Sequence, residues 1–402
     1  MLMHFIGIFM NLNFKGKEFD LFHPLIIVVM VILFVLIAMP MWYYYGKLPA
    51  PKLDLYIYIG IGLLSFILGI FLSGYLLNNK LPNIKKDSIS NDKLNKDESL
   101  ETAIPNPQKL SLSDKYSKNE IIIMGLVLLG ILLQIVNIAL LGGIPLFSAT
   151  LKAKAATKIW LLSYIIFLPS INILLATQNR KSHYILLLIG LVLFVLTGYR
   201  TTPIAIMLSA LITLYYTRDV DLKYIILSIL AIGIVLLAVG FIAVQAISWQ
   251  HWSLNPIELV SYRAAFTLNI FSSAIENQCV TMGNLFLSTL AGFFTHTDPR
   301  VLVGIATISR DHSITSTIFG PALLDFGIVG MIVQMFFLGM ILKTLHALQS
   351  NKKSIFTAFY GILLAQTIIW IETGPTDIVV WLFYLIGIFI IIHSLRGLDY
   401  GI

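Results

Sequence analysis

Arginine is the basic residue of one long segment in a chain that elsewhere prefers lysine. The chain contains 20 Lys and 7 Arg, yet between Ala243 and Phe319 its basic residues other than histidine are Arg263, Arg300 and Arg310. A guanidinium group presents a planar fork of N–H donors that binds phosphate or carboxylate through two bonds, whereas an ammonium group is a single hydrated point charge. The segment therefore predicts half of an anion-binding site.

A fourth arginine, Arg200, stands in a short break between two apolar runs, in the sequence LTGYRTTP at 196–203. A charge this close to hydrocarbon is costly unless it is paired or faces water. Gly198 permits a sharp bend, and Thr201, Thr202 and Pro203 suit the first turn of a helix, whose free N–H groups favour anions. The alternative interpretation is an interfacial arginine that extends to lipid headgroups.

Carboxylates accompany these arginines, and each has a structural interpretation beside a functional one. Asp325 lies inside an apolar run, where an ionisable group indicates function by default, although a buried pair with an arginine would also explain it. Glu276 and Arg263 flank one apolar stretch and would pair with each other in the simplest arrangement. Glu372 and Asp377 surround Gly-Pro, which is typical of an ordinary tight turn between helices.

Two further groups in the long segment have residue types that bind ligands. Trp249 and Trp252 next to a span predict belt aromatics, with a sugar-stacking surface as the alternative. His296 and Asp298 are metal-ligand types, but no third ligand stands at a diagnostic spacing, so no metal site is predicted.

The elements that must position these residues are membrane spans. The 402 residues are 58% hydrophobic and 12% charged, and they contain repeated apolar runs of about 20 residues, the length that crosses a bilayer. The prediction is an all-α polytopic integral membrane protein with about ten spans. These spans are expected near residues 22–45, 54–77, 120–141, 159–176, 184–198, 202–217, 224–247, 319–342, 355–371 and 377–394. Two shorter stretches, 264–274 and 285–294, predict re-entrant or interfacial helices, or twelve spans if both cross.

Charge asymmetry predicts the orientation of the chain. With a cytoplasmic N-terminus, 18 of the 27 Lys and Arg residues lie inside, so both termini are expected in the cytoplasm of a multi-pass cytoplasmic-membrane protein. Residues 1–402 form a single membrane domain, 248–318 an extracytoplasmic functional loop, and 79–119 a disordered cytoplasmic linker for which regulatory docking is the alternative. No cleaved signal peptide is expected at residues 1–14. The lone Cys279 excludes an internal disulfide.

Several of these features together resemble a known family. They are the outward GGIPLF at 142–147, the GYRT turn at 198–201, the single large outer loop, and DFGIVG at 325–330. From about Ile121 onward the chain resembles oligosaccharide repeat unit polymerases, the Wzy-type O-antigen polymerases, and is most similar to archaeal members. Related O-antigen ligases carry an arginine after a mid-chain span and a histidine before a Gly-rich helix start. Arg200 and His312 are similar in placement, although His312 stands 15 residues before Gly327, farther than in the ligase pattern.

The resemblance implies a GT-C-like membrane glycosyltransferase that needs no metal or other cofactor. Its substrates would be polyprenyl-linked oligosaccharides in the bilayer, and a flippase or chain-length regulator would be its protein partner. The net charge of +7 is explained by juxtamembrane anchoring, so no binding of nucleic acid is expected. Arg200, Arg300 and Arg310 would stabilise the departing phosphate or diphosphate, with Arg263 in reserve. The proton acceptor would be His312 first, followed by Asp325 and Glu276.

Three other functions compete with the polymerase. A sugar-lipid flippase or secondary transporter would also have many spans, but transporters usually show internal repeats and charged, broken helices near the midplane, which this sequence lacks. An O-antigen-ligase-like glycan transferase would use similar motifs. A non-catalytic scaffold for glycan precursors would not need several arginines at one site.

Overall fold

The structure is a computed structural model that describes residues 20–80, 117–178, 180–218, 220, 222–245, 255–292, 294, 298–351 and 355–399. Within these ranges the chain forms helices joined by turns, without strands. The elements in chain order are α2 (Ile26–Met39), the π-helical turn η1 (Pro40–Tyr44), α3 (Leu53–Lys80), α5 (Lys118–Leu141), the 3-10 turn η2 (Pro145–Phe147), α6 (Ala149–Lys154), α7 (Lys158–Thr177), α8 (Lys181–Val195), α9 (Thr201–Thr217), α10 (Leu222–Gln245), α11 (Pro256–Glu276), α12 (Asn284–Ala291), α13 (Pro299–Ile308), α14 (Gly320–Asn351), α15 (Ile355–Thr373) and α16 (Ile378–Asp399).

Each of the ten predicted spans coincides with a helix. Seven of the described helices are long and apolar enough to cross a bilayer, and these are the helices at Ile26–Tyr44, Leu53–Asn78, Lys118–Leu141, Lys158–Thr177, Gly320–Gln349, Ile355–Thr373 and Ile378–Leu395. Shorter apolar helices at Lys181–Val195, Thr201–Thr217 and Lys223–Ile234 account for the other three. The all-α polytopic membrane fold is therefore confirmed, while most of the expected linker at 79–119 lies outside the described residues.

The predicted short helices of the long loop are present with different bounds. The helix expected at 264–274 begins at Pro256 and ends at Glu276, because Asn255 and Glu258 form a capping box that starts it earlier than its apolar stretch. The stretch 285–294 is the short helix α12. A third helix, α13, was not predicted, although Asp298 before Pro299 is a typical helix start and caps it.

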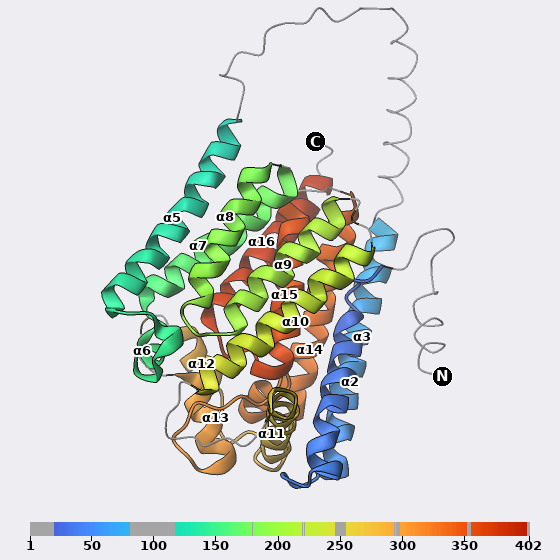
Figure 1. Cartoon of the computed structure of the whole chain (residues 1–402). Coiled ribbons are helices and arrows are strands. Elements are labelled where there is room, and N and C mark those ends of the chain that lie inside the picture. The colour runs from blue at the N-terminus through green and yellow to red at the C-terminus, as the bar shows by residue number, and fades with distance from the viewer. Residues whose placement is uncertain are drawn as a thin grey trace, which may run out of the picture.

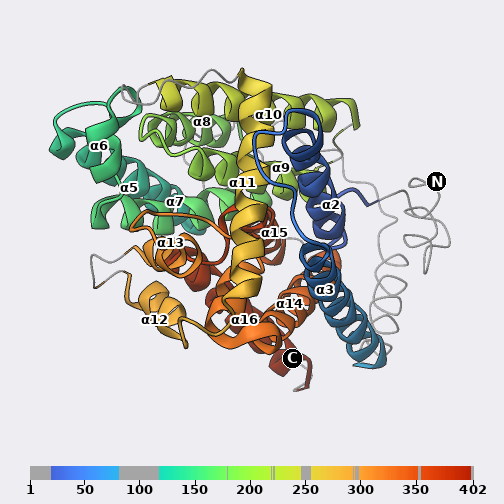
Figure 2. The same ribbon diagram turned by 90° about the horizontal axis from the view of Figure 1, so that it is seen from below.

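The loop helices gather at one end of the bundle. In Figure 1 the spans are seen from the side while α11 is seen along its axis, and in Figure 2 α11 lies lengthwise across the bundle. It therefore runs across the ends of the spans, as an interfacial helix does. We call this the loop end, defined by α6, α11, α12 and α13. The opposite end, where α3 ends and α5 begins, is the linker end.

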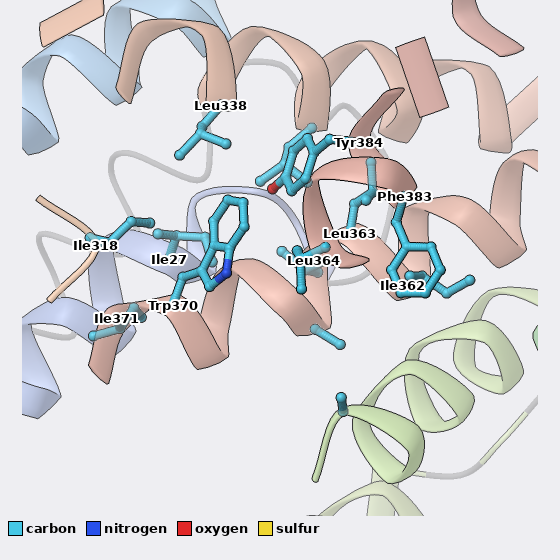
Figure 3. Close-up of a cluster of buried hydrophobic side chains, with 14 of the residues drawn as sticks. Ile27, Ile318, Leu338, Ile362, Leu363, Leu364, Trp370, Ile371, Phe383 and Tyr384 are labelled. Carbon is cyan, nitrogen blue, oxygen red and sulfur yellow. The ribbon is translucent and has the colours of Figure 1, made fainter. Parts of the chain in front are cut away.

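Helix α15 is the centre of the bundle. Trp370 and Leu364 of this helix lie among Ile27 of α2, Leu338 of α14 and Tyr384 of α16 (Figure 3), and all five side chains are buried. The ring of Trp370 stacks on Tyr384 with a centroid distance of 5.1 Å. Since α15 is covered along most of its length, its C-terminal end at the loop end is held in a fixed position.

Small residues allow the closest helix pair, α3 and α14, to pack backbone against backbone. A Cβ atom at Gly69 would lie 2.1 Å from the carbonyl oxygen of Phe336, and one at Gly339 would lie 2.2 Å from that of Phe66. Ser65 Oγ donates a hydrogen bond to the carbonyl oxygen of Ile332 at 2.7 Å. Small-residue seams with hydroxyl hydrogen bonds are typical of helix association in membranes.

Candidate functional site

Arg200 is positioned by the tight turn between α8 and α9. Gly198 has φ +73°, and a Cβ atom there would stand 3.2 Å from Leu146 Cα, so both the conformation and the close packing favour glycine. The N–H group of Leu146 donates to the carbonyl oxygen of Leu196 at 2.9 Å, which ties the turn to η2. Arg200 then occupies the N-cap position of α9, whose first turn contains Thr201, Thr202 and Pro203 as the sequence predicted.

Two arginines meet at one carboxylate. Arg200 Nη2 lies 2.7 Å and Arg263 Nε lies 2.9 Å from the same oxygen, Oε1 of Glu372. Arg200 comes from the start of α9, Arg263 from α11 across the bundle end, and Glu372 from the last turn of α15. The Arg200, Arg263 and Glu372 side chains are 28%, 43% and 28% exposed, so the group is accessible to solvent. We call these three residues the arginine triad.

The triad carries excess positive charge. Lys152 of α6 lies nearby, and burial lowers its pKa, as does repulsion from Arg200 and Arg263. Two guanidinium groups therefore share one oxygen of Glu372, and Lys152 adds a third basic side chain near them. Like charges placed together raise the free energy of the empty site, and a bound anion would relieve this repulsion.

A second charged group lies beside the triad. Arg300 Nε is 3.0 Å from Asp298 Oδ1, and Ser313 Oγ donates to Asp298 Oδ2 at 2.7 Å. Burial raises the pKa of Asp298, but Arg300 and Ser313 outweigh it and the pKa is lowered. Burial lowers the pKa of Arg300, but Asp298 and Asp377 outweigh it and the pKa is raised.

Tyr199 connects the two groups. It precedes Arg200 in the chain, its hydroxyl donates to the carbonyl oxygen of Lys152 at 3.0 Å, and its ring lies 5.6 Å from that of Trp160. Burial raises the pKa of Tyr199, and the positive charge of Arg300 opposes the rise. Arginines, carboxylates and an aromatic ring thus face one region at the loop end, a set that suits binding of an anion next to a polar ring such as a sugar.

Arg310 and His312 lie apart from the arginine triad. Both side chains are exposed on the turn that joins α13 to α14, and neither pairs with another residue that the structure describes. The turn itself is fixed by its backbone, since the N–H group of Arg310 donates to the carbonyl oxygen of Gly304 at 3.3 Å. Of the four predicted arginines, the structure joins Arg200 with Arg263, the reserve member, and not with Arg310.

Asp325 is fully engaged in holding α12. Its Oδ1 accepts hydrogen bonds from Thr281 Oγ1 at 2.6 Å and from the N–H group of Leu285 at 3.1 Å, and its Oδ2 accepts from the N–H group of Phe286 at 2.7 Å. These N–H groups belong to the first turn of α12, whose own N-cap residue, Gly283, offers no side chain. Asp325 therefore caps this helix from a distance.

Glu276 pairs with Lys52 and not with Arg263. The Nζ atom of Lys52 lies 2.6 Å from Glu276 Oε1, and both side chains are exposed. Since Arg263 reaches Glu372, the simple Glu276–Arg263 pair that the sequence suggested is absent from the structure. Of the earlier metal-ligand types, Asp298 is bound to Arg300 and Ser313, whereas His296 lies outside the described residues, as do Trp249 and Trp252.

Glu372 contacts both arginines, although its sequence context predicted only an ordinary turn. The turn is real, because Gly374 has φ +73° and its N–H group donates to the carbonyl oxygen of Trp370 at 2.9 Å. The available signal was a carboxylate at the very end of an apolar run, on the same predicted face as Arg200. Nothing in the sequence indicated that Lys152 and Tyr199 belong to the site, apart from their positions close to the GGIPLF and GYRT motifs.

The fold is that of a polytopic helical membrane protein, and at one end of its bundle two arginines meet at one glutamate. The chain belongs to the family described as "Putative O-antigen polymerase", whose family model matches residues 20–384. The family expected from the sequence resemblance is thereby confirmed.

Two archaeal proteins from Methanocaldococcus jannaschii are similar to the chain. The uncharacterized protein MJ0420 is 29% identical over 271 residues, which cover 67% of this chain and 65% of MJ0420. The uncharacterized protein MJ0419 is 27% identical over 274 residues, which cover 67% of this chain and 75% of MJ0419. The chain thus spans about two thirds to three quarters of these relatives. No solved structure matches the chain.

Proposed function

We propose that this protein is a membrane glycosyltransferase that joins polyprenyl-linked oligosaccharide repeat units, and that Arg200 and Arg263 bind the diphosphate of the lipid carrier. The observation that carries the proposal is the meeting of both guanidinium groups at one oxygen of Glu372, with side chains that solvent can reach. Membership of the O-antigen polymerase family supports a lipid-linked oligosaccharide as the substrate.

In this proposal Glu372 occupies the position of the anion in the resting site. A guanidinium group has five N–H donors, and Glu372 is the one described ion-pair partner of each triad arginine. Most of the donors are therefore available to a diphosphate. A planar fork can bind two phosphate oxygens at once, which explains why arginine and not lysine stands at both positions.

The chemistry that the site would support is departure of a polyprenyl diphosphate. As the bond between the sugar and the phosphate oxygen breaks, negative charge develops on the leaving group. Fixed guanidinium groups in a water-poor site stabilise such charge without having to reorganise during the reaction. Arg300, which lies near Tyr199, would extend the positive surface towards the acceptor sugar.

The loop end would face outward in this proposal. The count of basic residues places the N-terminus and the linker in the cytoplasm, so α6 and α11–α13 would lie at the outer surface of the cytoplasmic membrane. Helix α11, which runs across the bundle end, would then border the place where two lipid-linked substrates meet.

Reconstitution tests the proposed reaction. Purified protein in proteoliposomes is given lipid-linked oligosaccharides extracted from membranes of the source organism, and lipid-linked products are separated by length. The wild type should form longer lipid-linked chains, and Arg200→Lys should reduce their formation at least about 10²-fold, since it removes the fork but keeps the charge. Arg310→Lys is the matched control and should stay near the wild-type rate.

Three results would distinguish the alternatives. Transfer of the oligosaccharide to a soluble or different lipid acceptor without repeat-unit extension would indicate a ligase-like transferase. Movement of labelled lipid-linked oligosaccharide across the bilayer without any new glycosidic bond would indicate a flippase. Full activity of Arg200→Lys would contradict bidentate binding even if chain extension itself were observed.

A further inference from the structure

The carboxylates at the loop end differ in how much of their hydrogen-bonding capacity is used. Glu372 is held by two arginines, Asp298 by Arg300 and Ser313, and Asp325 by the first turn of α12. The carboxyl group of Asp377 is exposed and has no hydrogen bond to another residue that the structure describes. Of the two carboxylates that act on Arg300, Asp298 and Asp377, it is thus the one whose lone pairs no described hydrogen bond uses.

The backbone around Asp377 holds it in place. Thr376 donates its N–H group to the carbonyl oxygen of Gly374 at 3.0 Å, and Trp381 Nε1 donates to the carbonyl oxygen of Pro375 at 3.0 Å. A Cβ atom at Gly374 would lie 2.7 Å from the carbonyl oxygen of Thr317, so the turn packs tightly on the segment before α14. An exposed carboxylate on a rigid turn five residues after Glu372 is therefore presented at the same end as the triad.

The charged groups around Asp377 tune its proton affinity. Although solvent reaches the side chain of Asp377, the surrounding protein partly desolvates its carboxylate and so raises its pKa. Arg300 opposes the rise, and Asp298 adds to it. The other titratable groups within electrostatic reach are the phenols of Tyr199 and Tyr164, which are neutral near pH 7. A carboxylate whose pKa is raised is a better proton acceptor than one with an ordinary pKa, provided that it remains ionised at the working pH.

We propose that Asp377 is the proton acceptor for the attacking hydroxyl group of the acceptor sugar. This inference rests on the proposed glycosyl transfer. In the step, the acceptor oxygen forms a bond to the anomeric carbon of the donor while its proton passes to a carboxylate oxygen of Asp377. The bond from that carbon to the phosphate oxygen breaks, and its electron pair leaves with the polyprenyl diphosphate bound by Arg200 and Arg263.

The other ionisable groups fit this role less well. Glu372 lies between two guanidinium groups, which stabilise its charged form and weaken it as a base. The oxygens of Asp325 already accept three hydrogen bonds. His312 stands on the turn between α13 and α14, apart from the groups that contact Glu372.

The test compares Asp377→Asn and Asp377→Glu with the matched control Asp311→Asn, which removes an exposed carboxylate from the turn between α13 and α14. Reconstituted full-length proteins are assayed with extracted lipid-linked oligosaccharide at saturating concentration between pH 4.5 and 9. The dependence of the rate on pH is measured together with binding of inorganic pyrophosphate. Size-exclusion profiles and thermal unfolding midpoints check that each variant is folded.

Asp377→Asn should lower kcat by at least about 10²-fold and abolish the rise of the rate with pH on the acid side, with pyrophosphate binding unchanged. Asp377→Glu should keep part of the activity and shift the acid side of the pH–rate profile. If Asp377→Asn does not fold, this shift decides whether Asp377 is the proton acceptor. A wild-type rate or a wild-type acid side in folded Asp377→Asn would overturn the inference, as would a wild-type acid side in Asp377→Glu. An inactive wild type would instead contradict the proposed function itself.

Discussion

The charged clusters at the two ends of the helix bundle are built in opposite ways. At the linker end, Asp20 uses both oxygens: Tyr216 donates to Oδ1 at 2.7 Å, and Oδ2 lies 2.8 Å from Nε2 of His346. At the loop end, a single oxygen of Glu372 is shared by Arg200 and Arg263. Both oxygens of Asp20 thus have hydrogen-bond partners within the protein. Arg200 and Arg263, by contrast, share one acceptor oxygen and keep further N–H donors for a ligand.

Burial separates the two clusters as well. The side chains of Asp20 and His346 are 19% and 11% exposed, less than any member of the arginine triad. Nearby hydrogen bonds attach the chain before α2 to the spans, since the Tyr360 hydroxyl group donates to the carbonyl oxygen of Phe22. A buried, paired charge serves the fold, and an accessible excess of one charge indicates a ligand.

The largest expected effect comes from removing both triad arginines. Arg200→Ala and Arg263→Ala should each lower the rate of chain extension about 10²- to 10³-fold, because in the proposed reaction each removes a fixed donor to the leaving group. The double variant should lose less than the product of the two, because residues that share one partner are energetically coupled. Rates of the four proteins, measured in proteoliposomes, give the coupling directly.

Arg310→Ala is the control for this cycle and should remain near the wild-type rate. If instead Arg310→Ala were as damaging as Arg200→Ala while Arg263→Ala were neutral, the triad would not be the anion site. The exposed turn after α13 would then have to close over the substrate.

Removing the negative charge of Glu372 should slow chain extension less than removing either arginine. It should also strengthen anion binding, whereas loss of an arginine weakens it. Glu372→Gln should strengthen binding of inorganic pyrophosphate several-fold, since a competitor for the same guanidinium donors loses its charge. The rate should nevertheless fall about tenfold, because the two arginines lose the partner that aligns them. Isothermal titration with pyrophosphate and the extension assay measure both quantities, and weaker binding would mean that Glu372 does not occupy the position of the anion.

The spans and one turn of the site could be predicted from the sequence because their causes are local. Apolar length fixed the ten helices, and the GYRT turn needed only the positive φ of Gly198 and the helix start after it. Arg200 could therefore be placed at one end of the bundle without a structure.

The pairing of the triad could not be predicted, because it depends on how α11 crosses the bundle. Apolar length located 264–274 but missed the polar first two turns of α11, which contain Arg263, although the capping box at Asn255 and Glu258 marks the true start. The role of Asp325 was equally hidden, since the first turn of α12 that it caps lies 39–40 residues earlier in the chain.

At the linker end, the expected effect is on stability and not on rate. Asp20→Asn should lower the free energy of unfolding by about 1–3 kcal/mol, the usual consequence of weakening a largely buried hydrogen-bonded charge. Burial raises the pKa of Asp20, but His346 and Tyr216 outweigh it and the pKa is lowered. The carboxylate's contribution is therefore fully present above its unfolded pKa of about 3.9 and is lost as the pH falls through the lower folded value.

Thermal unfolding in detergent should accordingly show a gap between wild type and Asp20→Asn that is constant near pH 7 and shrinks below about pH 4. The extension rate of the folded variant should equal that of the wild type. A variant that unfolds normally but extends chains far more slowly would show that the linker end takes part in the reaction, which would break the contrast between the two ends.

The smallest effect is expected at Glu276, a loop-end carboxylate outside the triad. Its partner Lys52 is exposed, and water screens such a pair strongly, so neither stability nor the extension rate should change measurably in Glu276→Gln. The comparison with Glu372→Gln is informative because both variants lose one charge at the loop end and differ in whether the carboxylate contacts Arg200 and Arg263. If Glu276→Gln slowed extension as much as Glu372→Gln, overall charge at that end, and not the geometry of the triad, would control the reaction.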